Sequence, residues 1–345
     1  MFEGLTAFAS RHTLTKKGAT LYFHYPCFDG IISGVLALDF LVEHERWKVE
    51  HVCPINYRER STWLTTNLPT PSAVVDFLYH PQALFWADHH VTTFMDESGR
   101  SDFEHRKGQF RLYYNERAGS CALLLWRNLA RLLSDQDRYG EMVEWADKID
   151  SALYSSIEEA IFGDAPALRI NFSLMHKGGD DYGKWLVRQL GRKTLTQVAQ
   201  LPEIVGRYQK VRAMIQSGLD LLEQRIVLLD DEIAAFDVMN TSNVILSRYA
   251  PYYFFPNARY SIGILRQGAD ARITAMRNPW REFESVSLGK IFERYGGGGH
   301  QRVASVVLRG AFANSAEDIA DKLLRDIRET EFSETQMPMQ EGAVA

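Results

Sequence analysis

The sequence predicts a chain of two α/β domains, in which a first domain built on a parallel sheet is followed by a smaller one. Short apolar runs alternate with helical stretches along the first half of the chain, a pattern typical of strand–helix–strand units with parallel strands. The 345 residues exceed the usual size of one domain. The apolar share of 46% and the charged share of 24% are those of a globular protein, which excludes a disordered or collagen-like chain.

Four short apolar runs are expected to form the sheet of the first domain. These runs cover residues 19–23, 47–55, 73–77 and 83–87. Longer stretches with apolar residues at helical spacing predict helices over 31–42, over 121–133 with Ser120 as its cap, and over 141–149. The alternation of the two kinds of element favours parallel strands joined by right-handed crossovers.

The pattern changes after a long connector helix, which is expected over 201–230. Strands are predicted over 232–239, 260–266, 271–276 and 303–308, with helices that end at Tyr295 and run from 315 to about 330. These elements describe a second, smaller α/β domain. We therefore expect a first domain over 1–195, a connector over 196–231, a second domain over 232–330 and a frayed tail over 331–345.

Charge and cysteine content narrow the class of protein. Lys and Arg number 39 against 44 Asp and Glu, for a net charge of -5, which argues against a broad footprint on duplex nucleic acid but leaves room for a local basic groove. The three cysteines show no CxxC spacing, so neither a disulfide framework nor a structural zinc site is indicated. No run of 18 apolar residues occurs. We expect a cytoplasmic protein without a membrane partner.

Acids and histidines gather where the predicted strands of the first domain end. Because the carboxyl ends of parallel strands meet at one edge of a sheet, these groups are expected to share one rim. Carboxylates and imidazoles together are the ligands of centres in which two divalent ions activate water and neutralise a phosphate, and they suit manganese, with zinc, iron or magnesium as alternatives. The candidate groups are His24, Asp29, Asp76, Asp88, His89, His90 and Asp147. The pattern leaves Asp150 open as an alternative to Asp147.

A run of glycines in the second domain is a second candidate site. Gly296 to Gly299 are followed by His300, and consecutive glycines allow positive φ angles and a close approach of main-chain N–H groups to an anion. A flexible linker is the alternative. Arg277, at the end of a predicted strand, is a candidate phosphate clamp. Arg272 is a weaker candidate on the same strand.

The two sets of motifs together resemble the DHH superfamily of phosphoesterases. Asp88-His89-His90, preceded by Asp76 and by the loop from His24 to Asp29, resembles its phosphoesterase domain. Gly297-Gly298-Gly299-His300, followed by Val303-Ala304-Ser305, resembles the glycine-rich motif of the DHH-associated C-terminal domain. Both motifs occur in the expected order, and the resemblance covers nearly the whole chain.

The resemblance implies a two-metal phosphoesterase with its active site in the cleft between the domains. It implies metal binding by Asp29, Asp76, His89 and Asp147, with Asp76 bridging and His24 completing one ligand set. Asp88 would orient His89, and His90 would lie near the phosphate. The far end of the substrate would be held by Arg277, Gly297, Gly298, Gly299 and His300.

The sequence departs from the family at one metal-binding position. The first motif of the family commonly offers two acids in a DxD arrangement, whereas this chain has Cys27-Phe28-Asp29. As a thiolate, Cys27 could bind a soft metal, but the sequence favours a neutral packed thiol. The closing Ala-Ala-Gly of the glycine-rich motif is also changed, to Val303-Ala304-Ser305.

We expect a manganese-dependent phosphodiesterase, similar to nanoRNases and exonucleases, that acts on short single-stranded nucleic acid or small nucleotide phosphoesters and binds two ions. The chain has no room for the further domains of larger RecJ-type exonucleases, which favours short substrates. One alternative is a nucleotide-binding sensor with reduced catalysis, motivated by Cys27. Another is a pyrophosphatase or polyphosphatase. The oligomeric state stays open, with a homodimer as one alternative.

Overall fold

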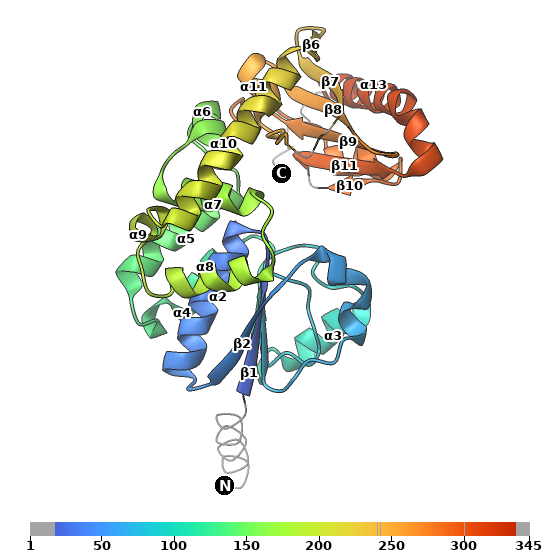
Figure 1. Ribbon diagram of the computed structural model, residues 1–345. Coiled ribbons are helices and arrows are strands. Elements are labelled where there is room, and N and C mark those ends of the chain that lie inside the picture. Colours follow the sequence, from blue (N-terminus) through green and yellow to red (C-terminus); the bar gives the residue numbers. More distant parts are fainter. Residues whose placement is uncertain (1–17, 240, 242, 300, 336–345) are drawn as a thin grey trace, which may run out of the picture. The chain divides into compact units, whose positions relative to one another are not determined.

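The computed structural model describes residues 18–239, 241, 243–299 and 301–335, and it divides into two compact units (Figure 1). The first unit comprises residues 1–154 and 164–211, and the second comprises 155–163 and 212–345. The short segment 155–163 therefore packs with the later part of the chain. The domain boundaries expected from the sequence stay a prediction.

The first unit is built on a five-stranded parallel sheet in the order β2-β1-β3-β4-β5. Its strands are β1 (Gly18–His24), β2 (Lys48–Ile55), β3 (Ser72–Val75), β4 (Phe85–Asp88) and β5 (Arg111–Tyr114). The four strands predicted from apolar runs are confirmed, and so is their parallel direction. β5 was not predicted, because its four residues Arg-Leu-Tyr-Tyr carry a single buried side chain, Leu112.

Helices cover this sheet, and the sequence analysis predicted only three of them. They are α2 (Phe28–Asp39), α3 (Glu97–Arg106), α4 (Cys121–Leu129), α5 (Gln136–Asp150), α7 (Pro166–Met175), α8 (Asp180–Leu190) and α9 (Leu195–Ala199). The three that were predicted are α2, α4 and α5. The helix expected over 31–42 begins earlier, at Phe28. α3 was missed because Gly99 and Phe103 are its only buried residues, so it lacks an apolar stripe.

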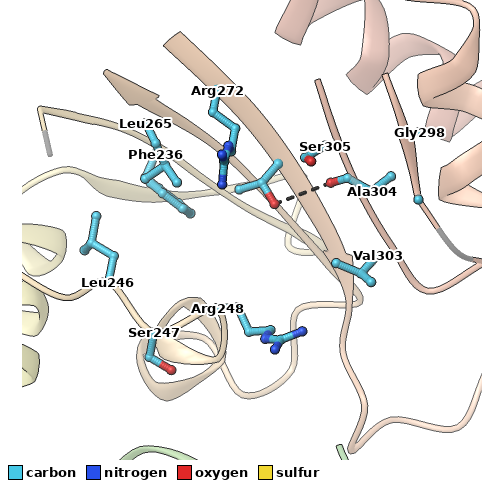
Figure 2. A pocket seen from close by; sticks show the side chains of 12 residues that line it. Phe236, Leu246, Ser247, Arg248, Leu265, Arg272, Gly298, Val303, Ala304 and Ser305 are labelled. Carbon is cyan, nitrogen blue, oxygen red and sulfur yellow. Dashed lines mark hydrogen bonds between the residues drawn. The ribbon is translucent and has the colours of Figure 1, made fainter. Parts of the chain in front are cut away.

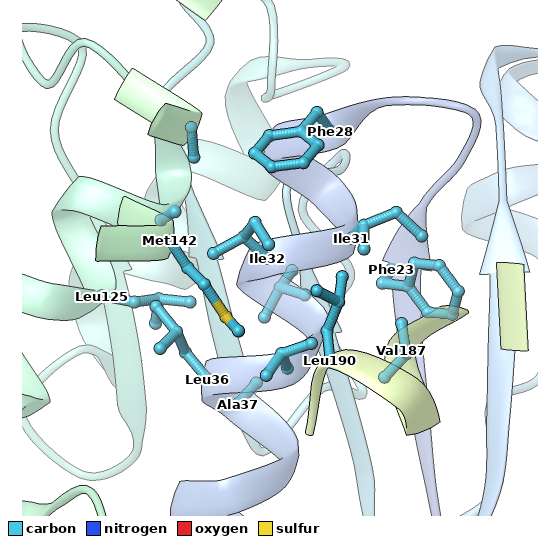
Figure 3. Close-up of a cluster of buried hydrophobic side chains, with 14 of the residues drawn as sticks. Phe23, Phe28, Ile31, Ile32, Leu36, Ala37, Leu125, Met142, Val187 and Leu190 are labelled. Atoms are coloured by element: carbon cyan, nitrogen blue, oxygen red, sulfur yellow. The ribbon is translucent and has the colours of Figure 1, made fainter. Parts of the chain in front are cut away.

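Both faces of the sheet are buried, as its parallel strands require. Figure 3 shows Ile32 and Leu36 of α2 facing Leu125 and Met142 on one side of the sheet. Each of these four side chains is at most 1% exposed and contributes roughly 1.5–3 kcal/mol of burial free energy. The other face is covered by an aromatic cluster that includes Trp63, Phe77, Trp86 and Phe103. This packing fixes the strand ends that carry the candidate site.

The second unit holds a six-stranded mixed sheet in the order β10-β11-β9-β8-β7-β6. Its strands are β6 (Ile226–Leu229), β7 (Ile233–Met239), β8 (Tyr260–Gln267), β9 (Asp270–Arg277), β10 (Gly298–Gly299) and β11 (Val303–Leu308). Only β7 and β8 pair in parallel. Its helices are α6 (Ile157–Phe162), α11 (Ala250–Phe254), α12 (Leu288–Glu293) and α13 (Ala316–Thr335). The smaller α/β domain predicted from the sequence is confirmed.

The connector helix was predicted too long. α10 spans Pro202–Glu223, and Ile226–Leu229 forms strand β6, which pairs with β7 in antiparallel fashion. Asp230 and Asp231 join the two strands with φ angles of 50° and 58°. Two consecutive positive φ angles are the signature of a tight hairpin turn, for which aspartate is a favoured residue. None of the helices in the described part of the chain is long and apolar enough to cross a membrane.

Candidate metal centre

The ends of three neighbouring strands bring the predicted acids and histidines together. β1 ends at His24, β3 is followed directly by Asp76, and β4 ends at Asp88. Phe23 is paired with Val75, and Val75 with Ala87, so the three strands end at the same level. The rim expected from the parallel topology is therefore present in the first unit.

Asp76 lies at the middle of this rim, and its two carboxylate oxygens face different histidines. Its side chain is 1% exposed, with Oδ2 at 3.3 Å from His24 Nδ1. Oδ1 lies 3.8 Å from His89 Nε2 and 3.8 Å from His90 Nδ1. Burial, together with the charges of Asp29 and Asp88, raises the pKa of Asp76 well above its ordinary value. Two oxygens that face different imidazoles are the arrangement that a bridging carboxylate requires.

The backbone of Asp76 is strained. Its φ of 56° lies in the left-handed region, which few residues other than glycine adopt. The hydrogen bond from Asp76 N to Ala87 O, at 2.9 Å, holds this conformation. Such strain persists where the surrounding structure enforces it, and it is frequent at functional sites.

Asp29 is fixed from the opposite side by the start of α4. Its Oδ2 accepts a hydrogen bond from Cys121 N at 2.7 Å, and its Oδ1 accepts one from Ala122 N at 2.8 Å. Gly30 is needed next to it, because a Cβ on Gly30 would lie 2.1 Å from His24 O. The close packing of α2 on the end of β1 therefore positions Asp29 at the rim.

The tautomer of His89 follows from its neighbours. His89 Nδ1 lies 3.0 Å from Ala118 O, and because a carbonyl only accepts, Nδ1 carries the proton. In the neutral ring Nε2 then presents a lone pair, at 3.4 Å from Asp150 Oδ2 and 3.7 Å from Asp29 Oδ2. A lone pair facing carboxylates is repulsive unless a cation lies between them. In metal-binding histidines, the ring nitrogen that does not bind the metal commonly donates to a backbone carbonyl, which fixes the orientation of the ring.

Asp88 shapes the loop that carries both histidines. Asp88 is fully buried, and its Oδ1 accepts hydrogen bonds from His89 N and from His90 Nδ1, each at 2.8 Å. Burial lowers the pKa of His90, but the hydrogen bond and the charge of Asp88 outweigh it, so that the pKa is raised overall. Asp88 thus bonds the ring of His90 and the backbone of His89; its predicted role in orienting His89 stays a prediction.

Of the two acids left open on α5, the structure places Asp150 against His89 and Asp29. The ligand atoms of these three residues lie within 4.8 Å of one another. Asp147 lies one helical turn earlier, beside Gly119 and Ser120. Burial raises its pKa, and a hydrogen bond from Ser120 acts against that rise. Among the described residues, Asp147 joins none of the clusters of three or more such donors, so Asp150 is the better candidate.

His24 and Cys27 form a further group with Asp76, again with ligand atoms within 4.8 Å of one another. Burial and the neighbouring His90 lower the pKa of His24 to about 4, so its ring is neutral at physiological pH. Burial and the charge of Asp76 raise the pKa of the Cys27 thiol. The ring of Tyr57 packs edge-on against His24, with centroids 5.2 Å apart.

Several buried polar atoms of this cluster lack a hydrogen-bond partner within the described chain. In the cluster they are Asp76 Oδ1, Asp88 Oδ2 and His89 Nε2, and Asp147 Oδ1, beside the cluster, is a further one. Leaving such atoms unpaired costs about 1–3 kcal/mol each, and more where they are charged. Divalent cations between the carboxylates and His89 would compensate this cost. The donors present, imidazole nitrogen and carboxylate oxygen with one thiol, therefore fit a metal centre.

The glycine run contributes to a cavity of about 280 Å³ in the second unit (Figure 2). Gly298 and Gly299 form β10, which pairs with Ser305 and Ala304 of β11. A Cβ on Gly299 would lie 2.2 Å from Val303 O, so the close approach of the two strands requires glycine there. The last two glycines of the run therefore form an edge strand of the sheet and are not part of a linker. Gly297 lies just before it, and His300 lies outside the described residues.

Arg277 is not among the residues that line this cavity, and the clamp predicted for it stays a prediction. Its guanidinium donates to Asn278 O at 3.0 Å and Phe283 O at 2.9 Å, and it lies 4.4 Å from the centre of the Phe283 ring. These contacts fasten the loop after β9. Two arginines, Arg248 and Arg272, line the cavity, and so does Phe236. Arg248 and Phe236 were missed because neither belongs to a motif.

No family model matches the sequence, and no curated protein matches it. Solved structures match in their fold. A pGpG-specific phosphodiesterase, PggH from Vibrio cholerae, superposes with a TM-score of 0.69 at 15% identity, over 91% of this chain and 99% of that chain. The DHH domain of a member of the s1p family of ribosomal proteins superposes with a TM-score of 0.58 at 14% identity, over 94% and 89% of the two chains.

A larger protein contains the same fold as part of its length. RecJ from Thermus thermophilus, in complex with Mn²⁺, superposes with a TM-score of 0.51 at 12% identity, over 93% of this chain and 54% of that chain. The resemblance predicted from Asp88-His89-His90 and the glycine run is confirmed at the level of the fold. The chain has the two-domain α/β fold of the DHH proteins.

Proposed function

We propose that the chain is a metal-dependent phosphodiesterase that hydrolyses short oligonucleotides or small nucleotide phosphoesters. The observation that carries this proposal is the position of Asp76, whose two oxygens face two separate groups of metal-binding donors. The fold supports it, because a pGpG-specific phosphodiesterase and RecJ in complex with Mn²⁺ are among the similar structures. Linear dinucleotides are the substrate class that we would test first.

The described residues form three donor groups, one of which is Asp76, Asp88, His89 and His90, and we propose ion positions at the other two. One is formed by Asp29, His89 and Asp150, and the other by His24, Cys27 and Asp76. Manganese suits the imidazole and carboxylate donors, with magnesium as an alternative. A pair of divalent ions would supply a nucleophilic water and neutralise the charge that develops on the phosphate.

His90 is proposed to act on the phosphate itself. Its Nδ1 is held by Asp88 at 2.8 Å, which fixes the plane of the ring. Since its pKa is raised, the ring carries more positive charge near neutral pH than an ordinary histidine does. It can therefore donate a hydrogen bond to a phosphate oxygen or to the leaving group.

The cavity of the second unit is proposed to bind the part of the substrate that does not react. Arg248 and Arg272 offer charged donors for a phosphate, and Phe236 offers a ring against which a base can stack. Gly298 and Gly299 allow the backbone to approach the substrate closely.

The proposal is tested with purified protein, manganese and a radiolabelled dinucleotide such as pGpG. We expect conversion to mononucleotides, and a loss of at least about a thousandfold in kcat for His89→Ala, in line with the several kcal/mol that metal catalysis contributes. Ser155→Ala, in the second unit, serves as the control. Absence of turnover with every divalent ion tried would refute the proposal.

The same assay separates the two alternatives that the sequence raised. Tight dinucleotide binding without turnover would identify a sensor. Release of inorganic phosphate from pyrophosphate, with no cleavage of dinucleotides, would identify a pyrophosphatase. The homodimer stays a prediction, which the mass of the protein in solution would test.

A further inference from the structure

We infer that Cys27 is a metal ligand and that the ion position formed by His24, Cys27 and Asp76 prefers a thiophilic cation such as zinc. The inference rests on the proposed metal centre and specifies the chemistry of one of its two positions. It reverses the interpretation of Cys27 as a packed neutral thiol.

The first observation is the grouping of donors. Nitrogen, sulfur and oxygen atoms of the three residues lie within 4.8 Å of one another. Ligands bound to one zinc ion at about 2.0–2.3 Å have to lie roughly 3–4.5 Å apart. The observed spacing therefore needs only small side-chain movements to enclose an ion.

The second observation is independent of the cysteine. Asp76 is 1% exposed, and its Oδ2, the oxygen on the side of His24 and Cys27, lies 3.3 Å from Nδ1 of His24. A buried carboxylate without a full set of partners is unstable unless a cation compensates it.

The backbone places Cys27 firmly. It directly precedes α2, and its carbonyl accepts a hydrogen bond from Ile31 N at 3.1 Å. The side chain makes no capping hydrogen bond of standard geometry to the helix, and the backbone N–H of Gly30 acts on the sulfur. The chain has no carboxylate at 26, 27 or 28, and thus the thiol is the donor that this loop offers beside Asp29.

The other cysteines are used differently. Cys121 is fully buried, and its Sγ donates to Ala87 O at 3.3 Å. Cys53 lies on β2 and joins none of the donor clusters found in the described ranges. Cys53 is therefore the matched control for Cys27.

Thiolate sulfur selects ions differently from carboxylate oxygen. Sulfur ligands favour zinc, cobalt and iron, whereas carboxylate and water suit magnesium and manganese. Binding exchanges the thiol proton for the ion: the S–H bond breaks, a sulfur–metal bond forms, and the proton passes to solvent without any change of oxidation state. The position of Asp29, His89 and Asp150 has no sulfur, so the two positions are expected to differ in the ion they prefer.

Cobalt substitution tests the inference directly. Apoprotein loaded with Co²⁺ is expected to show the near-ultraviolet charge-transfer absorption of a cobalt–thiolate bond. The absorption should persist in Cys53→Ala and disappear in Cys27→Ser. Cobalt bound by the wild-type protein without this absorption, or an unchanged spectrum in Cys27→Ser, would overturn the inference.

A second variant keeps a ligand and changes its chemistry. Cys27→Asp replaces sulfur by oxygen. We expect its zinc affinity to fall at least about tenfold, which is the smallest loss typical of changes even to residues that only support a metal ligand. Manganese binding should be retained. Equal zinc affinity of Cys27→Asp and wild type would contradict a thiolate ligand. Circular dichroism checks that each variant folds.

The failure of this inference can be told apart from failure of the proposed function. If two ions bind per chain and dinucleotides are cleaved without a cobalt–thiolate absorption, only the role of Cys27 is wrong. If no ion binds at all, the metal centre itself is wrong.

Discussion

The carboxylate of Asp76 combines backbone strain, burial and like-charged neighbours at one residue. Its φ is 56°, its side chain is 1% exposed, and Asp29 and Asp88 both raise its pKa. A group that costs stability in the absence of a cation is retained where a cation offsets that cost. Removing the charge of this side chain should therefore raise the stability of the metal-free protein and weaken metal binding.

Asp76→Asn should make the metal-free protein more stable and weaken binding of both ions that Asp76 is proposed to bridge. Because the pKa of Asp76 is raised in the fold, its ionisation penalty is absent below the unfolded pKa of about 3.9 and grows as the pH rises through the folded pKa. Asparagine removes this penalty and tolerates positive φ. We expect a gain of about 1 kcal/mol at pH 7, measured by urea unfolding in a chelator. A variant that is less stable than wild type there would contradict the account.

Metal binding should release protons and weaken as the pH falls. The pKa values of Asp76 and Cys27 are both raised in the metal-free state, and each must lose its proton to bind an ion. We expect release of at least one proton per chain at pH 7, measured by calorimetry in buffers of different ionisation enthalpy. Cys27→Ser should release fewer protons. Identical proton release by the two proteins would argue against the thiolate.

At the scale of elements, close backbone contacts hold the strand ends and the helix that carries Asp29. Gly30 in α2 has no room for a side chain, because a Cβ there would lie 2.1 Å from His24 O. Gly206 in α10 has open space, with no atom of the described residues within 4 Å of such a Cβ. Both glycines lie on helices, so substituting alanine at each compares a crowded position with an open one.

Gly30→Ala should destabilise the protein by roughly 1–3 kcal/mol through overpacking, and it should weaken metal binding because Asp29 moves with the helix. Gly206→Ala should be neutral or stabilising by up to about 1 kcal/mol, because alanine favours a helix. Thermal unfolding and metal titration of both variants check this. Equal effects of the two changes would show that the contact at Gly30 is unimportant.

The two arginines of β9 should separate stability from substrate binding. Arg277 bonds two backbone carbonyls, so Arg277→Ala should cost about 2 kcal/mol and leave KM nearly unchanged. Arg272 is exposed and lines the cavity, so Arg272→Ala should leave stability within about 0.5 kcal/mol and raise KM. Urea unfolding and dinucleotide kinetics measure the two effects. The reverse pattern would identify Arg277 as the clamp.

Sequence reasoning succeeded where periodicity and topology decide the outcome. Apolar runs revealed four of the five parallel strands, and their parallel direction predicted that His24, Asp76 and Asp88 meet. Sequence reasoning failed where the outcome depends on which side of a helix a residue faces. Asp147 and Asp150 differ by one turn of α5, and no pattern told which one faces His89. The contacts of Arg277 were not predicted, because the carbonyls it binds lie in a loop whose path the sequence does not reveal.

At the scale of the whole molecule, each compact unit has its own apolar core. The metal donors all belong to the first unit. A ligand that binds only one folded unit stabilises that unit by mass action, by about 2.7 kcal/mol at a concentration of about 100 Kd. Saturating manganese should therefore raise the unfolding temperature of the first unit, and a chelator should reverse this. A calorimetric scan in which every transition moves equally would show that the units unfold as one.

The central claim is that Asp76 bridges two divalent ions at the rim of the parallel sheet. Anomalous diffraction from crystals of the manganese-loaded protein tests it most directly. We predict two peaks, one on the side of Asp76 Oδ2 toward His24 and Cys27, and one on the side of Oδ1 toward His89, Asp29 and Asp150. A map with no peak at Asp76, or with ions bound only elsewhere, would contradict the account.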